Sequence, residues 1–164
     1  MRRAPTIAVS GPGGDVPAEL LDLAHEVGAL LARDGAVLVT GGLDGVMAAA
    51  ARGAGTAGGQ TLGLLPGDNP EDGTEQLFLP LPTGLGQVRN ALLVNVADAV
   101  ISVGGSWGTL SEIALARRAG KPVICLRGWS ITDASGQPVP LVFADTASAA
   151  VDLLRTALDW QASG

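Results

Sequence analysis

The chain has few of several residue types, and each shortage excludes a class of protein. The single cysteine, Cys125, excludes an intramolecular disulfide, and the single histidine, His25, makes the composition unsuited to a zinc site. Aromatic residues make up 3% of the 164 positions, so we expect a core of Val, Leu, Ile and Ala. Charged residues make up 16%, which is too few for a disordered tail or a coiled coil.

Long apolar runs and a basic balance are also missing. No apolar run reaches the roughly 18 residues of a membrane span. The run at residues 7–9, behind the N-terminal arginines, is too short for a signal peptide. The formal net charge of −6 argues against broad nucleic-acid binding, which needs a basic face. We therefore expect a cytoplasmic protein that binds neither membranes nor nucleic acids.

The pattern that is present alternates short apolar runs with segments of helical periodicity. Strands are expected at residues 6–10, 36–40, 61–65, 77–81, 99–103, 123–126 and 141–144, and helices at 17–34, 45–54, 86–98, 109–118 and from about 146. Such alternation predicts right-handed crossovers and helices on both faces of a mostly parallel sheet. The sequence thus predicts one α/β domain over residues 1–164, with a Rossmann-like sheet of about seven strands.

Two segments have special features. Pro80 and Pro82 place the fourth expected strand at an edge of the sheet. The turn-rich stretch at residues 66–73 is either a solvated loop or a mobile lid.

Three glycine-containing turns follow expected strands, after Ser10, Thr40 and Val103. In parallel sheets ligands bind at the carboxyl ends of the strands, so these turns mark the expected binding site. None of them contains G-x-G-x-x-G or the Walker lysine pattern, which disfavours a dinucleotide dehydrogenase and a P-loop ATPase.

The sharpest motif covers residues 103–112, where a buried strand leads through two glycines into a helix. Glycines let the backbone approach a ligand closely, and the unpaired N–H groups of a helix N-terminus bind anions. Ser106 and Thr109 can add hydroxyl donors. The alternative is a structural capping box, in which Glu112 reaches back to a cap at Thr109.

Arg89 and Asn90 lie near the start of the helix expected at 86–98. A cation in the first turn of a helix opposes the helix dipole at a cost of about 0.3–1 kcal/mol. A ligand phosphate or the carboxylate of Glu112 would offset that cost. The alternative is an arginine that extends into solvent.

The two remaining turns complete the candidate site. Asp44 is a good N-cap for the second helix, and the glycines before it either close over a ribose or phosphate or only turn the chain. The turn after Ser10 either forms one wall of the site or only turns the chain. The expected ligand- and phosphate-binding residues are Ser10, Gly11, Gly41, Gly42, Arg89, Asn90, Gly104, Gly105, Ser106, Gly108 and Thr109.

Other residues with chemical potential are assigned mainly to packing. Trp107, in the glycine turn, either stacks on a base or packs, whereas Trp129 and Trp160 are expected to be structural. Cys125 lies within an expected strand and should be a small core residue. His25 lies beside the apolar face of a helix and is expected at the surface or in packing.

Together the motifs resemble those of the Lonely Guy superfamily. They are Gly41-Gly42-x-x-Gly45-Val46-Met47, then Arg89-Asn90, then Gly104-Gly105-x-x-Gly108-Thr109-x-x-Glu112. Their order and spacing cover most of the chain, up to about Leu126. The resemblance is closest to the branch that holds uncharacterised Rossmann nucleotide-binding proteins and the molybdenum cofactor carrier protein.

The resemblance implies roles for particular residues. In the superfamily's phosphoribohydrolases, an arginine and the motif glutamate act on a nucleoside 5′-monophosphate and release the free base and ribose 5-phosphate. Carried over, Arg89 and Glu112 would be the catalytic pair. Those hydrolases usually have Arg-Lys where this chain has Arg89-Asn90, and Pro where it has Val103. The resemblance also implies a homo-oligomer, a dimer or a tetramer.

Three functional hypotheses therefore share one phosphate seat. The first is binding of a nucleotide or a nucleotide-like phosphate compound. The second is a 5′-monophosphate phosphoribohydrolase that uses Arg89 and Glu112. The third is a carrier for the molybdenum cofactor, with molybdopterin as the ligand. No metal site is expected.

Overall fold

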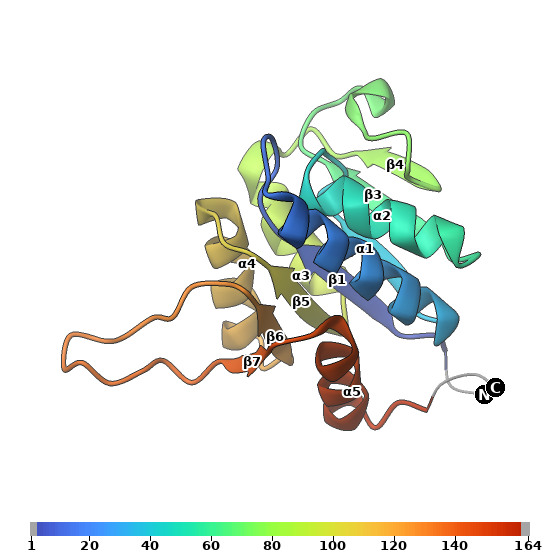
Figure 1. Ribbon diagram of the computed structural model, residues 1–164. Coiled ribbons are helices and arrows are strands. Elements are labelled where there is room, and N and C mark those ends of the chain that lie inside the picture. The colour runs from blue at the N-terminus through green and yellow to red at the C-terminus, as the bar shows by residue number, and fades with distance from the viewer. Residues whose placement is uncertain (1–2, 162–164) are drawn as a thin grey trace.

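The computed structural model describes residues 3–161 and builds them around one seven-stranded sheet (Figure 1). All neighbouring strands are parallel, in the order β4-β3-β2-β1-β5-β6-β7. The strands are β1 (Thr6–Ser10), β2 (Val37–Thr40), β3 (Thr61–Leu65), β4 (Leu79–Pro82), β5 (Ala99–Val103), β6 (Val123–Leu126) and β7 (Val142–Ala144). The predicted Rossmann-like α/β class is confirmed.

Helices cover both faces of the sheet, because the strands are apolar on both faces. The helices are α1 (Ala18–Arg33), α2 (Val46–Thr56), α3 (Arg89–Val96), α4 (Trp107–Arg118) and α5 (Ala147–Leu158), with short 3-10 turns η1 (Pro70–Asp72) and η2 (Gly86–Val88). Helices α1, α2 and α5 pack on one face, in a core that contains Ile7 and Val9. Helices α3 and α4 pack on the other face, in a core that contains Ala8. Alternate residues of β1 thus serve opposite layers.

Small residues bring α1 and α2 into close contact. A Cβ on Gly28 would lie 2.0 Å from the carbonyl oxygen of Ala50, and one on Gly53 would lie 1.9 Å from that of His25. The two backbones therefore touch, and a methyl group at either glycine would force the helices apart. The small residues of α2 serve this contact within the chain.

The two edges of the sheet differ in protection. β4 is an edge strand, as Pro80 and Pro82 predict, and prolines weaken its ability to pair further. β7 forms the other edge and leaves Val142 and Phe143 exposed. Between β6 and β7, residues 130–141 form an extended arm that projects from the body, coloured orange in Figure 1. One bridge, Thr132 to Pro138, pairs its two limbs.

Two helix starts differ from the sequence expectation. α4 begins at Trp107, two residues earlier than expected, because the hydroxyl of Ser106 caps it. The helix expected at 86–98 begins as the 3-10 turn η2, and α3 itself starts at Arg89. Across residues 3–161, no helix is long and apolar enough to cross a membrane.

Candidate functional site

Buried polar side chains gather where the strand order changes direction. β1 lies between β2 and β5, and the helices that follow β1 and β5 cover opposite faces. In open parallel sheets this arrangement leaves a crevice at the carboxyl ends of the two strands. Ser10 ends β1 beside Ser102 of β5. The buried polar residues at the ends of β1, β2 and β5 or on helices α3 and α4 are Ser10, Thr40, Arg89, Asn90, Ser102, Thr109 and Glu112.

The turn between β5 and α4 leaves backbone donors free. Ser106 accepts a hydrogen bond from the Thr109 N–H at 3.2 Å, and the two hydroxyls lie 2.9 Å apart. The next backbone N–H, that of Leu110, bonds to the Ser106 carbonyl. Before that, four successive N–H groups, at residues 105–108, have no acceptor among residues 3–161. A run of free N–H groups at the positive end of a helix is suited to an anion.

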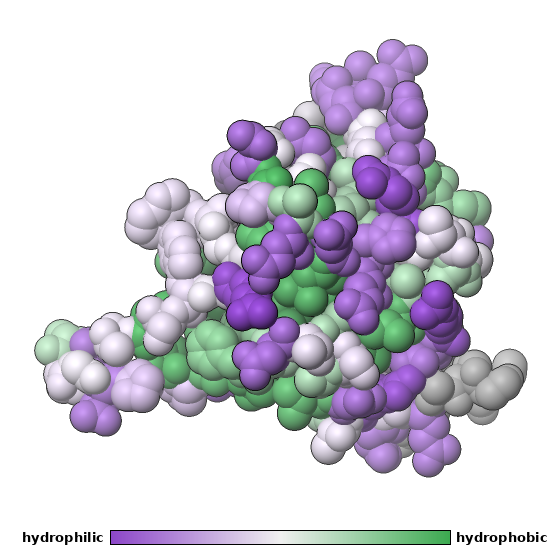
Figure 2. Space-filling view, in the orientation of Figure 1, coloured by the Kyte–Doolittle hydropathy of each residue, from purple (hydrophilic) through white to green (hydrophobic). Residues whose placement is uncertain are grey.

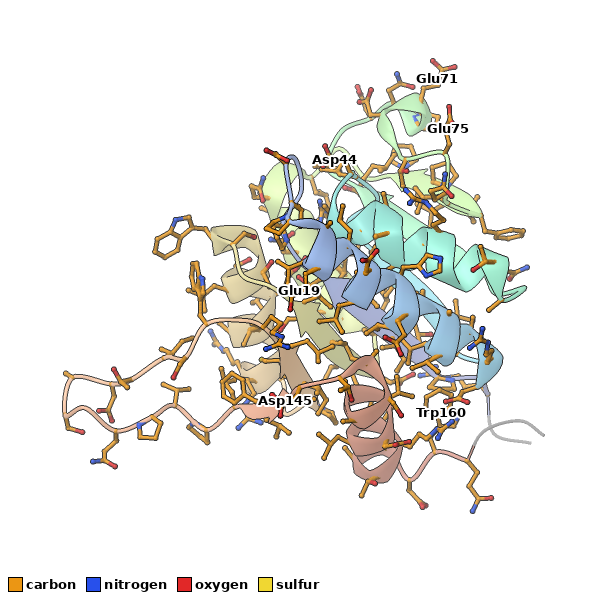
Figure 3. The ribbon with its side chains drawn as sticks, viewed as in Figure 1. Glu19, Asp44, Glu71, Glu75, Asp145 and Trp160 are labelled. Carbon is orange, nitrogen blue, oxygen red and sulfur yellow. The ribbon has the colours of Figure 1, made fainter. Side chains whose placement is uncertain are left out.

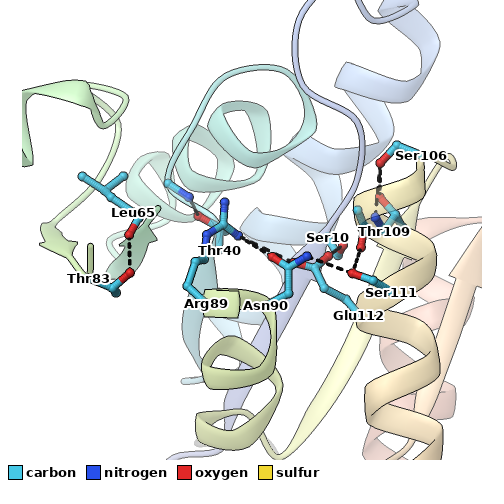
Figure 4. Close-up of polar contacts among 12 residues, drawn as sticks. Ser10, Thr40, Leu65, Thr83, Arg89, Asn90, Ser106, Thr109, Ser111 and Glu112 are labelled. Atoms are coloured by element: carbon cyan, nitrogen blue, oxygen red, sulfur yellow. Dashed lines mark hydrogen bonds and ion pairs between the residues drawn. The ribbon is translucent and has the colours of Figure 1, made fainter. Parts of the chain in front are cut away.

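The capping box that was the alternative interpretation of this motif does not form. The cap is Ser106, so Glu112 lies in the second turn of the helix, where it cannot reach back to the cap. Instead Glu112 faces the sheet and forms a hydrogen bond with the Ser10 hydroxyl (Figure 4). The glutamate therefore belongs to the centre of the site and has no part in capping.

Arg89 faces Glu112 inside the protein, so the alternative of a solvent-extended arginine is excluded. Their side chains are only 7% and 8% exposed, and Nη1 of Arg89 lies 3.8 Å from Oε1 of Glu112. Nη1 donates to Oδ1 of Asn90 at 3.1 Å, but Nε has no partner within the described chain. A buried, unpartnered N–H on a cation is costly unless a ligand supplies an acceptor.

A chain of hydrogen bonds links the two helices around this pair. Nδ2 of Asn90 donates to Oγ of Ser111 at 2.8 Å, and that hydroxyl donates to the carbonyl of Gly108 at 2.7 Å. The start of α3 is thereby tied to the start of α4, as Figure 4 shows. Sequence reasoning missed Ser111, whose signal was its place in α4 directly before Glu112.

Burial shifts the pKa values of both Arg89 and Glu112 toward their neutral forms. Burial raises the pKa of Glu112 to about 7, although the charge of Arg89 acts in the opposite direction. Burial also lowers the pKa of Arg89, and the Glu112 charge only partly offsets this. The long separation explains the imbalance, because a 3.8 Å contact returns less energy than desolvation costs. Near neutral pH the glutamate therefore holds a proton in a large fraction of molecules.

The turn between β2 and α2 forms the opposite wall. Gly41 lies against the arginine: a Cβ there would be 2.5 Å from Nη1 of Arg89. Gly42, at φ 78°, donates to the Thr40 hydroxyl at 3.1 Å and packs on Leu65. Gly41 is therefore at the site, whereas Gly42 shapes the turn behind it.

One other expectation about this end of the sheet is wrong, and Gly11 has a structural role. Asp44 does not cap α2, since the cap is Gly45 and Oδ1 of Asp44 instead accepts from the Gly14 N–H at 2.9 Å. This bond ties the turn after β2 to the loop after β1. Gly11 fills a tight space, where a Cβ would be 2.5 Å from the Val103 carbonyl. Its role in the structure is the close approach of two strand ends.

An acidic hollow lies away from this network. It has a volume of about 580 Å³ and is lined by Leu43, Asp44 and residues 71–76. Figure 2 shows hydrophilic side chains over this projecting part, where Figure 3 labels Glu71 and Glu75. Its carboxylates repel phosphate, so it is unsuited to the ligand that the glycine turns favour. Among residues 3–161 there is no group of His, Cys, Asp and Glu arranged to hold a metal.

Comparison with known proteins identifies the family. The model of the SLOG cluster4 family matches residues 4–151. The chain belongs to that family. A curated relative is the cytokinin riboside 5′-monophosphate phosphoribohydrolase of Mycobacterium tuberculosis, 32% identical over 143 residues, in a match that covers 78% of this chain and 73% of the relative. The resemblance to the Lonely Guy superfamily is thereby confirmed.

Two solved structures that are similar to this chain are of proteins of one kind. The molybdenum cofactor binding protein of the phototrophic bacterium Rippkaea orientalis is 35% identical, with a TM-score of 0.85 over 96% of this chain and 99% of that one. The molybdenum cofactor carrier protein of Chlamydomonas reinhardtii is 33% identical, with a TM-score of 0.82 over the same shares. The chain is thus similar both to a hydrolase and to molybdenum cofactor proteins.

Proposed function

We propose that the protein binds a small phosphate-bearing compound, a nucleotide or a nucleotide-like pterin, at the carboxyl ends of β1, β2 and β5. One observation carries the proposal: the buried Nε of Arg89 has no partner in the described chain, and a second feature at the start of α4, which Asn90 and Ser111 tie to α3, also lacks acceptors. That feature is the set of four free N–H groups at residues 105–108, which we call the phosphate seat. A phosphate offers several acceptor oxygens and the negative charge that both features lack.

The phosphate seat can be tested by substitutions at Ser106 that differ in charge. Ser106→Asp keeps a good N-cap but places a negative charge over the seat, whereas Ser106→Asn caps equally well and is neutral. We expect AMP binding, measured by calorimetry, to survive in the Asn variant and to fall at least tenfold in the Asp variant. Equal affinities in the two variants would refute the seat.

Hydrolysis of a nucleoside 5′-monophosphate is the second candidate, and the state of Glu112 favours it. A buried carboxylic acid with a pKa of about 7 can protonate a departing base, and its carboxylate form can stabilise positive charge on the sugar. The decisive assay follows release of free base from AMP and from an N6-substituted AMP by chromatography. Release that disappears in Glu112→Gln identifies a phosphoribohydrolase.

The two candidates differ in their response to that substitution. A hydrolase loses turnover in Glu112→Gln, and its rate falls as pH rises through 7 because the acid loses its proton. A carrier releases no base, keeps its affinity in Glu112→Gln and protects a bound pterin from oxidation. The cofactor-binding relatives from Rippkaea and Chlamydomonas support molybdopterin as the ligand to test first.

Association of copies is part of the proposal. Solution scattering should give a dimer or a tetramer, and a monomeric mass would overturn this part alone.

A further inference from the structure

Two tryptophans border the free N–H groups of the β5–α4 turn. Trp107 is the first residue of α4 and is 81% exposed. Trp129, which follows β6, is 38% exposed and was expected from the sequence to be structural. In contrast Trp160, labelled in Figure 3, packs against the core. In a chain with so few aromatic residues, two exposed indoles beside one turn need an explanation.

The two rings contact each other edge to face. Their centroids are 5.1 Å apart and their planes differ by 78°. This is a favourable aromatic geometry, and it fixes one ring against the other. With four fifths of Trp107 exposed, most of its ring surface stays open to a flat partner.

The backbone positions Trp129 on the glycine turn. A Cβ on Gly105 would lie 2.6 Å from Nε1 of Trp129, so only glycine allows the indole to lie there. That indole N–H has no acceptor among the described residues. The turn that brings it in is unusual, because Arg127 adopts φ 52° although it is not glycine. A strained residue of this kind persists where the surrounding structure requires it, often at a binding site.

We infer that Trp107 and Trp129 form an aromatic platform that stacks the flat heteroaromatic ring of the ligand. The inference rests on the proposed function, since the phosphate of the same molecule would lie on the N–H groups of residues 105–108. Trp107 contributes to both parts, its own N–H to the seat and its ring to the platform. Purines and pterins share the flat, polarisable surface that stacks on an indole.

Four probes separate the platform from the phosphate seat. They are AMP, ribose 5-phosphate, adenosine and neopterin, each titrated by calorimetry into the wild type, Trp107→Ala and Trp129→Ala. Phe78→Ala is the matched control, because Phe78 is also an exposed aromatic residue, 62% exposed next to β4. Trp107→Ala and Phe78→Ala should unfold at a temperature similar to that of the wild type, because both rings are largely in solvent, whereas Trp129→Ala removes a mostly covered ring and should unfold at a lower one.

We expect AMP affinity to fall about tenfold or more in Trp107→Ala, and ribose 5-phosphate affinity to change less than about twofold. Trp107→Phe should recover most of the lost affinity, and Phe78→Ala should match the wild type. Unchanged AMP affinity in both tryptophan variants overturns the platform. If AMP and ribose 5-phosphate also bind the wild type equally well, the phosphate seat stands without a platform.

The phosphate-free probes cover the opposite case. Binding of adenosine or neopterin that depends on Trp107, with no binding of ribose 5-phosphate, keeps the platform and refutes the phosphate seat. The tighter of the two rings then identifies the ligand as a purine or a pterin. No binding of any of the four probes overturns both proposals.

Discussion

Two arginine–carboxylate pairs flank β5, one at each end of the strand, and they are built in opposite ways. At the amino end, Arg3 forms two hydrogen bonds of 2.9 and 2.6 Å with Asp98, whose carboxylate also accepts the Thr6 N–H at 2.8 Å. At the carboxyl end, Arg89 and Glu112 lie 3.8 Å apart without a direct hydrogen bond. In the first pair the two charged groups bond directly to each other, whereas in the second the Nε of Arg89 has no partner in the described chain.

The pKa values follow from this difference. Burial alone would raise the pKa of Asp98, but the bonds from Arg3 and Thr6 and the nearby positive charges outweigh it and lower the pKa. Burial of Glu112 is deeper and is not outweighed, so its pKa rises to about 7. An unbalanced, buried pair costs stability, and proteins retain such a cost at sites that bind a ligand. The comparison thus separates a pair whose charged groups bond directly to each other from a buried pair that does not.

The largest expected effect concerns the pH dependence of stability. Between pH 4.5 and 7 the folded protein keeps a proton on Glu112 that the unfolded chain releases. Its free energy of unfolding therefore falls as pH rises through this range, by up to about 3 kcal/mol. Glu112→Gln lacks this penalty, so the variant should gain stability relative to the wild type between pH 5 and pH 8. Urea unfolding at both pH values measures the change.

The control for this prediction is Glu26→Gln, which alters an exposed glutamate on α1. Its stability should follow that of the wild type at both pH values. If Glu112→Gln also follows the wild type, Glu112 is ionised at neutral pH and the pair is an ordinary ion pair.

The second effect is on ligand affinity. Arg89→Met removes the buried cation and its free N–H, and charged hydrogen bonds contribute about 1.5–3 kcal/mol. We expect the affinity for AMP to fall roughly ten- to hundredfold. Because the Arg89 charge lowers the pKa of Glu112, the variant should also raise that pKa above 7. Calorimetry and the pH profile of unfolding measure the two results.

Arg117→Met is the matched control, since Arg117 is an exposed arginine in the last turn of α4. It removes the same charge from the protein but should leave AMP affinity unchanged. Equal losses in the two variants would mean that net charge matters and that Arg89 has no special role.

The sequence predicted the fold well because its signals are local. The bounds of β3, β5 and β6 match the expected strands, since each is an apolar run that ends at Pro66, at glycine or at the arginine before glycine. The seven parallel strands and the two prolines at an edge also follow from patterns within short windows. The start of α4 was predicted less accurately, because Ser106 and Thr109 are both suitable cap residues.

The interior of the site could not be predicted in the same way. Ser10 and Glu112 are 102 positions apart, and they meet only because β1 and β5 are neighbours in the sheet. Local rules left a cap open as the alternative role of Glu112 and exposure to solvent as that of Arg89, and both alternatives are wrong. Both errors have one cause, since the burial of a charged side chain depends on which strands and helices surround it.

The third prediction concerns Asn90, whose amide holds the Arg89 side chain in place. Asn90→Ala removes the acceptor of one Arg89 N–H and the bond to Ser111 that ties α3 to α4. The substitution leaves the Arg89 charge and its free N–H in place and removes only a supporting bond, so AMP affinity should fall about fivefold, well short of the Arg89→Met loss. Ser111→Ala, which keeps the bond to Arg89, should cost less. A larger effect in Ser111→Ala would place the main support on α4.

The smallest effect is expected at the amino end of β5, where Asp98→Asn breaks the ion pair but leaves an oxygen for the Thr6 N–H. The pair is largely solvated and screened by salt, so at pH 7 the melting temperature should fall by a small amount and AMP affinity should not change. Because the pKa of Asp98 is lowered in the folded state, its contribution is present above pH 3.8 and is lost as pH falls below that value. The wild type and Asp98→Asn should therefore converge in acid, whereas the wild type and Glu112→Gln diverge as pH rises toward 7. Melting curves at pH 3, 5 and 8 compare the two carboxylates directly, and the same sign for both would remove the distinction between the two pairs.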